Sequence, residues 1–123
     1  MAKSKRKKES FRFRYNKFKH HEGVQCFYDD MNKKYFKHQL PLVFVGFYYD
    51  RDDSYGATLR LHGAKYCSHI MLNPKFKEWV KATKITLLHE MCHVKLHNKG
   101  GHGPKFKKEL RRLILAGAFD DLL

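Results

Sequence analysis

The chain is 123 residues long, with 42% hydrophobic and 31% charged residues, which fits one globular domain and excludes a chain that is disordered or membrane-embedded throughout. Its 26 lysines and arginines outnumber its 12 aspartates and glutamates, giving a net charge of +14, so a polyanion such as nucleic acid is an expected partner. Three widely spaced cysteines without a C-x-x-C pair exclude a disulfide framework or a cysteine zinc ribbon, so we expect an intracellular protein, cytoplasmic or, in a eukaryote, nuclear.

Residues 1–20 are expected to form a basic arm in front of a domain that runs over residues 21–123. The arm holds nine lysines and arginines against one acid, Glu9, which is more than half of the excess positive charge. Aromatic and basic residues alternate between Phe11 and Lys19, so this stretch could offer stacking faces and phosphate contacts to a single nucleic-acid strand. Alternatively this stretch is an edge strand or a lead into the first helix, with its aromatic side chains in the core. The tail before it could likewise serve only solubility or nuclear import.

The elements after the arm indicate an α+β fold. Apolar residues recur at helical spacing over 22–37, and the segment stops before Pro41, which predicts a first helix. Three strands are predicted over 42–49, 55–62 and 65–72. Because short turns join them, we expect an antiparallel three-stranded meander with no membrane-spanning segment.

The second half of the domain is predicted to be helical. Asn73 can cap a short helix that opens at the following proline. The strongest helix is predicted over 83–98 with Thr83 as its N-cap, and glycines end it. A final helix is expected to start at Pro104 and to fray beyond Gly117. We expect the first and strongest helices to pack on the sheet, with the active-site cleft between them.

The main chemical signal is a His-Glu-x-x-His element in the strongest helix. Residues four apart project from one helical face about 6 Å apart, so His89 and His93 can chelate one cation. Glu90 lies about 100° around the helix, where its carboxylate can reach a metal-bound water without ligating the metal. Zinc suits such a site because it accepts imidazole nitrogen and lowers the pKa of its bound water from about 16 towards ~7. The alternative is a solvent-facing helix whose histidines have ordinary surface roles.

A catalytic zinc usually has three protein ligands and an open position, so a third ligand is expected nearby. His97 lies about 12 Å along a straight helix from His89, too far for one ion to join it to both motif histidines, and is expected to be a surface or supporting residue. His102 follows Gly100-Gly101, where the chain can reverse and return an imidazole to the site, and it is our predicted ligand. Glu109 remains the alternative ligand.

The residues of the motif, together with the sequence Gly-His-Gly-Pro-Lys-Phe over 101–106, resemble the SprT-like zinc metalloproteases, the family that includes Spartan. The resemblance runs from about residue 24 to 115 and includes 32–41, Gly56 and 67–74. It implies a zincin-like domain with three zinc ligands, His89, His93 and His102, with Glu90 as the catalytic glutamate, and with substrates that are proteins associated with DNA. The chain departs from the family in its short connection between His93 and His102, and it lacks the cysteine-rich zinc ribbon of bacterial relatives.

We therefore expect a zinc-dependent endopeptidase in which zinc and Glu90 activate water, acting on DNA-associated proteins as in the repair of DNA–protein crosslinks. DNA contact would come from the basic surface and the N-terminal arm. The alternative function is a nucleic-acid-binding module with a structural zinc site and no protease activity.

Overall fold

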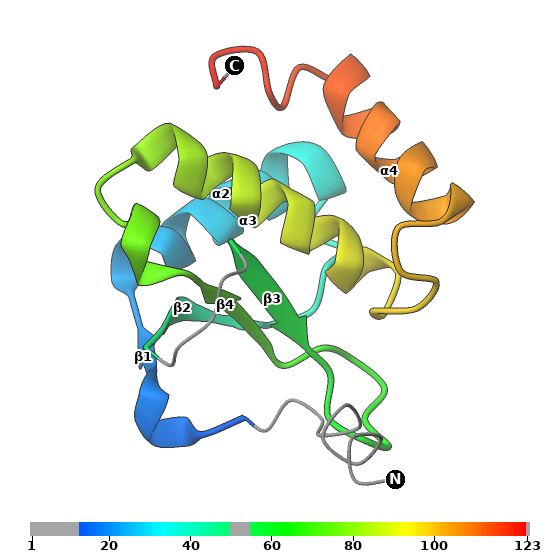
Figure 1. Ribbon diagram of the computed structural model, residues 1–123. Coiled ribbons are helices and arrows are strands. Elements are labelled where there is room, and N and C mark those ends of the chain that lie inside the picture. The colour runs from blue at the N-terminus through cyan, green and yellow to red at the C-terminus, as the bar shows by residue number, and fades with distance from the viewer. Residues whose placement is uncertain (1–12, 50–54, 123) are drawn as a thin grey trace, which may run out of the picture.

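The computed structural model describes residues 13–49 and 55–122, so the predicted tail and the predicted turn at 50–54 lie outside the described residues (Figure 1). The described chain has three α-helices and a four-stranded mixed sheet, which confirms the α+β class. The elements are β1 (Phe18–His20), α2 (Glu22–Phe36), β2 (Phe44–Tyr48), β3 (Gly56–Leu59), β4 (His69–Leu72), α3 (Val80–Lys95) and α4 (Pro104–Leu115), with 3-10 turns η1 (Tyr15–Lys17) and η2 (Pro74–Phe76). No helix in the described ranges is long and apolar enough to cross a membrane.

The sheet differs from the predicted meander. Its strand order is β1-β2-β4-β3, with β2 parallel to β4 and the other two pairs antiparallel. Every residue of β4 is buried, whereas every residue of β3 is only partly buried. The continuous apolar run of β4 therefore suits a central strand that is covered on both faces, and β3 takes the edge. The short turn predicts the hairpin of β3 and β4 correctly. It does not reveal that β2 pairs with β4, on the side of β4 opposite to β3.

The fourth strand, β1, comes from the aromatic and basic stretch before the first helix. It pairs with β2 at the outer edge of the sheet, which confirms the edge-strand interpretation for Phe18–His20. The rings of Phe13 and Phe18 lie 4.9 and 5.0 Å from the ring of His69, measured between centroids. These aromatics therefore cover the sheet face that carries His69, whereas Tyr15 is largely exposed.

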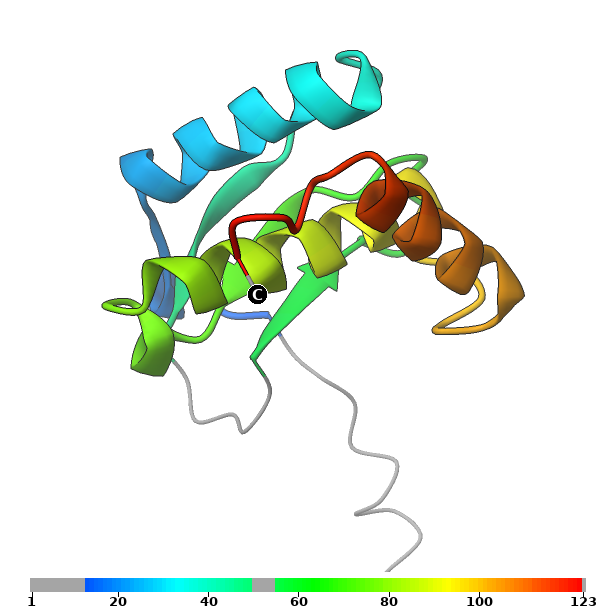
Figure 2. The same cartoon turned by 90° about the horizontal axis from the view of Figure 1, so that it is seen from above.

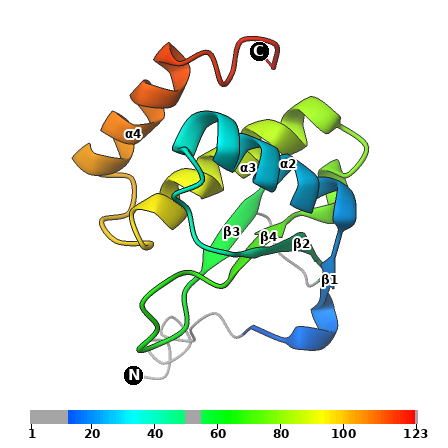
Figure 3. The same cartoon turned by 180° about the vertical axis from the view of Figure 1, so that it is seen from behind.

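Helices α2 and α3 lie side by side over the same face of the sheet, and α4 packs against α3 (Figures 1 and 2). Helix α2 contacts β2, and α3 contacts β3 and β4; seen from behind, both helices lie on the same side of the sheet (Figure 3). The core lies in this layer, where alternate residues of the central strands meet the helices: Val45, Phe47, Ile70 and Leu72. Helix α3 contributes five residues that are fully buried, Leu87, Leu88, Met91, Cys92 and Val94.

The helix boundaries follow the local sequence signals with two corrections. Helix α2 matches its prediction within one residue, and α4 begins at Pro104 as expected. Helix α3 begins at Val80, so Thr83 is not its N-cap but a residue of its first turn. The Thr83 hydroxyl donates to the carbonyl of Phe76, in the preceding turn η2. The chain also does not fray beyond Gly117, since Ala118 and Phe119 are buried in the core. Gly117 has a φ of 90°, which turns the chain back onto the helices.

Candidate metal centre

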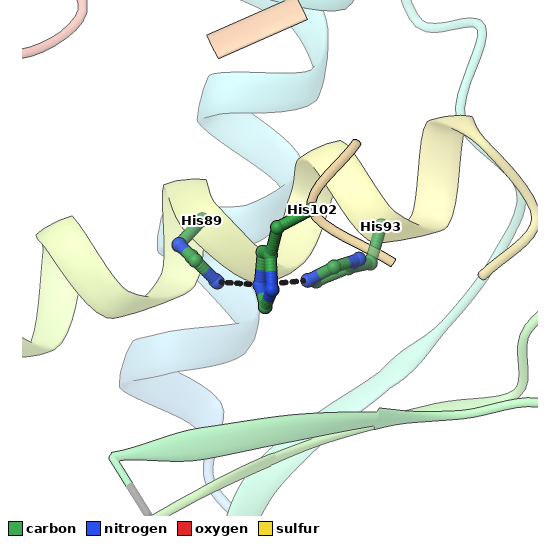
Figure 4. A group of neighbouring side chains, drawn as sticks. All are labelled: His89, His93 and His102. Atoms are coloured by element: carbon green, nitrogen blue, oxygen red, sulfur yellow. Dashed lines mark hydrogen bonds between the residues drawn. The ribbon is translucent and has the colours of Figure 1, made fainter. Parts of the chain in front are cut away.

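Three histidine side chains converge between α3 and the loop that follows it (Figure 4). His89 and His93 project from α3, and His102 comes from the α3–α4 loop. The Nε2 atom of His102 lies 3.2 Å from the Nε2 atoms of both helical histidines. One nitrogen from each ring lies within 4.8 Å of the others, so the group could hold a metal ion.

The loop returns His102 to the helix through four residues with left-handed backbone. Gly100 and Gly101 have φ values of 82° and 54°, as expected for the predicted reversal. The reversal begins earlier than predicted, because His97 and Asn98 also have φ values of 57°. L-residues with side chains adopt this conformation at a cost, so other contacts must hold them there.

The edge strand supplies those contacts. The side-chain amide of Asn98 donates to the carbonyl of Thr58 over 3.1 Å. The guanidinium of Arg60, just after β3, donates to the carbonyl of His97 over 2.8 Å. The position of His102 therefore depends on β3 as well as on the glycines of its own loop.

The donor chemistry of the three rings fits a shared cation. A neutral imidazole has one N–H and one acceptor nitrogen, so three convergent Nε2 atoms cannot all be satisfied by donating to one another. Ligand nitrogens at about 2.0–2.1 Å from a tetrahedral zinc would lie roughly 3.3 Å apart, close to the 3.2 Å that separates Nε2 of His102 from Nε2 of each helical histidine. Burial, together with the neighbouring histidines, lowers the pKa of His93 to about 4 and also lowers the pKa of His89. Both rings are therefore neutral near pH 7, as a metal ligand must be.

Phe106, in the first turns of α4, backs the cluster. Its ring centroid lies 4.9 Å from that of His89, 4.7 Å from that of His93 and 4.8 Å from that of His102. The Phe106 side chain is itself buried. This single apolar ring limits the rotamers of all three imidazoles and shields one side of the cluster from water.

Glu90 lies next to the cluster with only 5% of its surface exposed. Its Oε1 accepts a hydrogen bond from the Thr58 hydroxyl at 2.7 Å. Burial raises the pKa of Glu90 to about 7, although the hydrogen bond from Thr58 opposes that rise. Glu90 and His89 line the same hollow of about 260 Å³ between β3 and α3. The carboxyl group is therefore able to exchange a proton near neutral pH inside this hollow.

A close approach of β3 to α3 brings Thr58 to Glu90. A Cβ atom added at Gly56 would lie 2.9 Å from Cγ2 of Thr86 and 3.2 Å from the carbonyl oxygen of Met71. Only glycine fits between the strand and the helix at this point without displacement. Gly56 thus allows the contact that orients the Glu90 carboxyl group.

The two other residues considered as ligands lie elsewhere. Glu109 is buried against Lys95 and Arg112, whose nitrogens approach its carboxylate to 2.9 and 2.6 Å. It is not part of the metal-binding group found among the described residues. His97 also lies outside this group; its ring is 5.7 Å from that of Tyr66.

Sequence reasoning missed two residues of the site. Phe106 enters the sequence argument only as the last residue of Gly-His-Gly-Pro-Lys-Phe, and nothing in the spacing of the motif indicates that its ring contacts the histidines. Thr58 carried no signal of its own, because the pairing of β3 with β4 and its distance from α3 are tertiary properties. The nearest hint was Gly56, two residues earlier, which belongs to the family resemblance.

Comparison with known families and proteins gave one match. Residues 24–118 match the family model described as the SprT-like family. This range covers the first helix, the sheet from β2 onward, the three histidines and α4. Searches of curated proteins and of solved structures gave no match.

Proposed function

We propose that this chain, which belongs to the SprT-like family, is a zinc-dependent endopeptidase with His89, His93 and His102 as ligands and Glu90 as general base. The observation that carries the proposal is the arrangement of three convergent imidazoles beside a buried carboxyl group with a pKa of about 7. Few functions other than metal-assisted hydrolysis use this combination of groups.

The chain's own residues would divide the chemistry as follows. Zinc, when bound, polarises the scissile carbonyl and makes water a better nucleophile at neutral pH. Glu90 would accept the proton of the attacking water and then donate it to the leaving amine. The Thr58 hydroxyl holds one carboxylate oxygen, so the other is available for the proton.

The surroundings of the site favour a catalytic ion over a structural one. A structural zinc site is closed by four protein ligands, whereas the metal-binding group among the described residues has three. His102 is exposed and His89 is partly exposed, so a substrate can reach the cluster from solvent. A nucleic-acid module with a purely structural zinc is therefore the weaker alternative.

The substrate would enter along the edge strand. Within the described residues β3 pairs with no strand other than β4, and an extended peptide would add to the part of its outer edge that the hydrogen bond from Asn98 to the Thr58 carbonyl leaves free. Tyr55, Ile85 and Thr86 line the hollow beside His89 and Glu90, and they would contact a side chain of that peptide. A peptide bound in this way would have its scissile bond near the histidines.

The proposed class of substrate follows from the charge of the chain and from its family resemblance. The net charge of +14 favours association with nucleic acid. Helix α4 exposes Lys105, Lys107, Lys108 and Arg111, and its single acid, Glu109, is buried against two cations. Together with the family resemblance, this supports proteins bound or crosslinked to DNA as substrates, within a cellular compartment that contains DNA.

A Glu90→Gln variant tests the proposal. It removes the base but keeps the size of the side chain, so we expect the zinc content to stay at the wild-type level and cleavage of an unfolded protein to fall at least 100-fold. Glu78→Gln, on an exposed residue outside the site, is the matched control. Cleavage is followed by gel and zinc by elemental analysis, with and without a DNA-bound protein. If the zinc-loaded wild type cleaves neither substrate, or Glu90→Gln cleaves both normally, the proposal is wrong.

A further inference from the structure

A cavity of about 570 Å³ lies between the C-terminal ends of α2 and α3 and the last turn of α4. It shares no lining residue with the hollow beside Glu90 or with the three histidines. Its size is that of a site for a small organic ligand. The proposed peptidase chemistry makes no use of it.

The lining combines aromatic rings with cations and contains no acidic side chain. Tyr35, Phe36 and Tyr66 contribute the rings, and 46% of Tyr66 is exposed at the rim. The guanidinium of Arg112 already lies 5.2 Å from the centroid of the Phe36 ring. Such a lining suits a ligand that has both a flat ring and a negative charge.

The cations of the lining are only partly neutralised. Lys37, Lys95 and Arg112 line the cavity, and Glu109 is the one carboxylate that binds any of them in the described chain. Lys37 has no ion pair with a described residue. The wall therefore keeps an excess of positive charge that an anion would neutralise.

A buried polar atom adds a second, independent observation. Nδ1 of His97 is inaccessible to solvent and has no hydrogen-bond partner among the described residues, and His97 lines the same cavity. An unsatisfied buried polar atom is uncommon and costs about 1–3 kcal/mol. Only a ligand whose binding turns the His97 ring towards the cavity would satisfy this atom.

The positive charge continues from the cavity onto the surface. A second hollow, of about 450 Å³, shares Lys95 and Arg112 with the cavity and adds Lys105 and Lys108 of α4. Glu109 also lines this second hollow, but it is paired with Lys95 and Arg112, so a ligand that extends in this direction would meet the cations Lys105 and Lys108, which form no ion pair with a described residue. This is the pattern expected for a repeating anion rather than for an isolated one.

We propose that this cavity binds one unpaired nucleotide of a single-stranded nucleic acid, with the base against Tyr66 and the backbone phosphates running from Lys37 and Arg112 towards Lys108. The proposal rests on the proposed function only in its link to nucleic acid, and it does not require peptidase activity. It places strand recognition on the face of α4 and the ends of α2 and α3, in addition to any contact made by the N-terminal arm.

The test is a binding titration without any protein substrate. The full zinc-loaded chain is titrated into a fluorescently labelled oligothymidylate, and affinity is read by anisotropy over a range of salt concentrations. Stacking of one base on an aromatic side chain contributes about 1–3 kcal/mol of binding free energy. Tyr66→Ala should therefore weaken binding at least fivefold, and Tyr66→Phe should keep the wild-type affinity. Tyr49→Ala is the matched control, since Tyr49 is 44% exposed but lies away from the cavity.

The salt dependence separates phosphate contacts from a general loss of structure. Lys37→Gln and Lys108→Gln should each lower the slope of log affinity against log salt by about 0.7, the value for one phosphate contact on a single strand. Lys81→Gln, an exposed lysine near the other end of α3, should leave the slope unchanged.

Wild-type affinity and slope in Tyr66→Ala and Lys37→Gln would overturn the proposal. The proposal is also overturned if a labelled polyglutamate peptide binds more tightly than the oligonucleotide and Tyr66→Ala and Lys37→Gln abolish that binding. The cavity would then be a site for an acidic peptide. The peptidase proposal is decided separately by Glu90→Gln, so either can fail while the other stands.

Discussion

Replacing Gly56 by alanine tests whether the close approach of β3 to α3 shapes the site. The new Cβ would lie 2.9 Å from Cγ2 of Thr86, a separation that real Cβ atoms essentially never show, and 3.2 Å from the carbonyl oxygen of Met71. The strand, the helix or the Thr86 side chain must therefore shift. Overpacking of this kind costs about 1–3 kcal/mol of unfolding free energy, partly offset by the roughly 0.4–1 kcal/mol that alanine contributes by restricting the unfolded chain.

The same shift would act on the site through Thr58. The Thr58 hydroxyl lies 2.7 Å from Oε1 of Glu90, and a displacement of β3 by a few tenths of an ångström lengthens this bond. We expect peptidase activity to fall by about 10-fold to 100-fold. Zinc binding should weaken less, because the other two ligands come from α3 and only His102 depends on β3, through the bonds of Asn98 and Arg60. Chemical denaturation gives the stability, and cleavage of an unfolded protein gives the activity.

Thr86→Ser supplies the second arm of a double-mutant cycle. It removes Cγ2, the atom that the new Cβ would meet first, and keeps the hydroxyl that donates to the carbonyl of Ala82. The double variant should recover about 0.5–1.5 kcal/mol relative to the sum of the two single variants. The reasoning is refuted if Gly56→Ala is as stable and active as the wild type, or if the two changes are additive within about 0.3 kcal/mol.

Two further predictions concern a ligand and a buried histidine. His102→Ala should lose zinc on dialysis. Glu109→Ala should keep zinc and lose about 1–3 kcal/mol of unfolding free energy, because the carboxylate binds Lys95 and Arg112 rather than the cluster. Zinc loss from Glu109→Ala alone would reverse the ligand assignment. Burial lowers the pKa of His69, so the unfolded chain binds a proton more readily than the folded one. Stability should therefore fall as pH decreases below about 6.5, the ordinary histidine value, and pH-dependent denaturation should show a smaller fall in His69→Phe; equal falls in both proteins would contradict this assignment.

The helices could be predicted because their signals are local. The apolar spacing of 22–37 and the proline at 104 predict α2 and the start of α4 closely. The start of α3 was misplaced because Thr83, a residue typical of N-caps, forms its hydrogen bond to Phe76 within a helix that had already begun at Val80. The residue type alone does not show whether a threonine is the N-cap of a helix or lies in its first turn.

The order of the strands could not be predicted in this way. Strand spacing and short turns are compatible with a meander, and the pairing of β2 with β4 depends on how much surface each strand buries against the helices. The complete burial of β4 and the partial burial of β3 decide that β4 is central. Burial on both faces is a property of the packed domain, even though the apolar run in β4 is visible in the sequence.

The sequence by itself determined the chemical groups of the site and part of its geometry. Helical periodicity places His89 and His93 on one face with Glu90 beside it, and the glycines before His102 allow the chain to reverse. Tertiary structure decided the rest: Phe106 against all three rings, Thr58 on Glu90, and Tyr66, Lys37 and Arg112 around one cavity. These contacts join segments far apart in the chain, and only the packing of the sheet and helices brings such segments together.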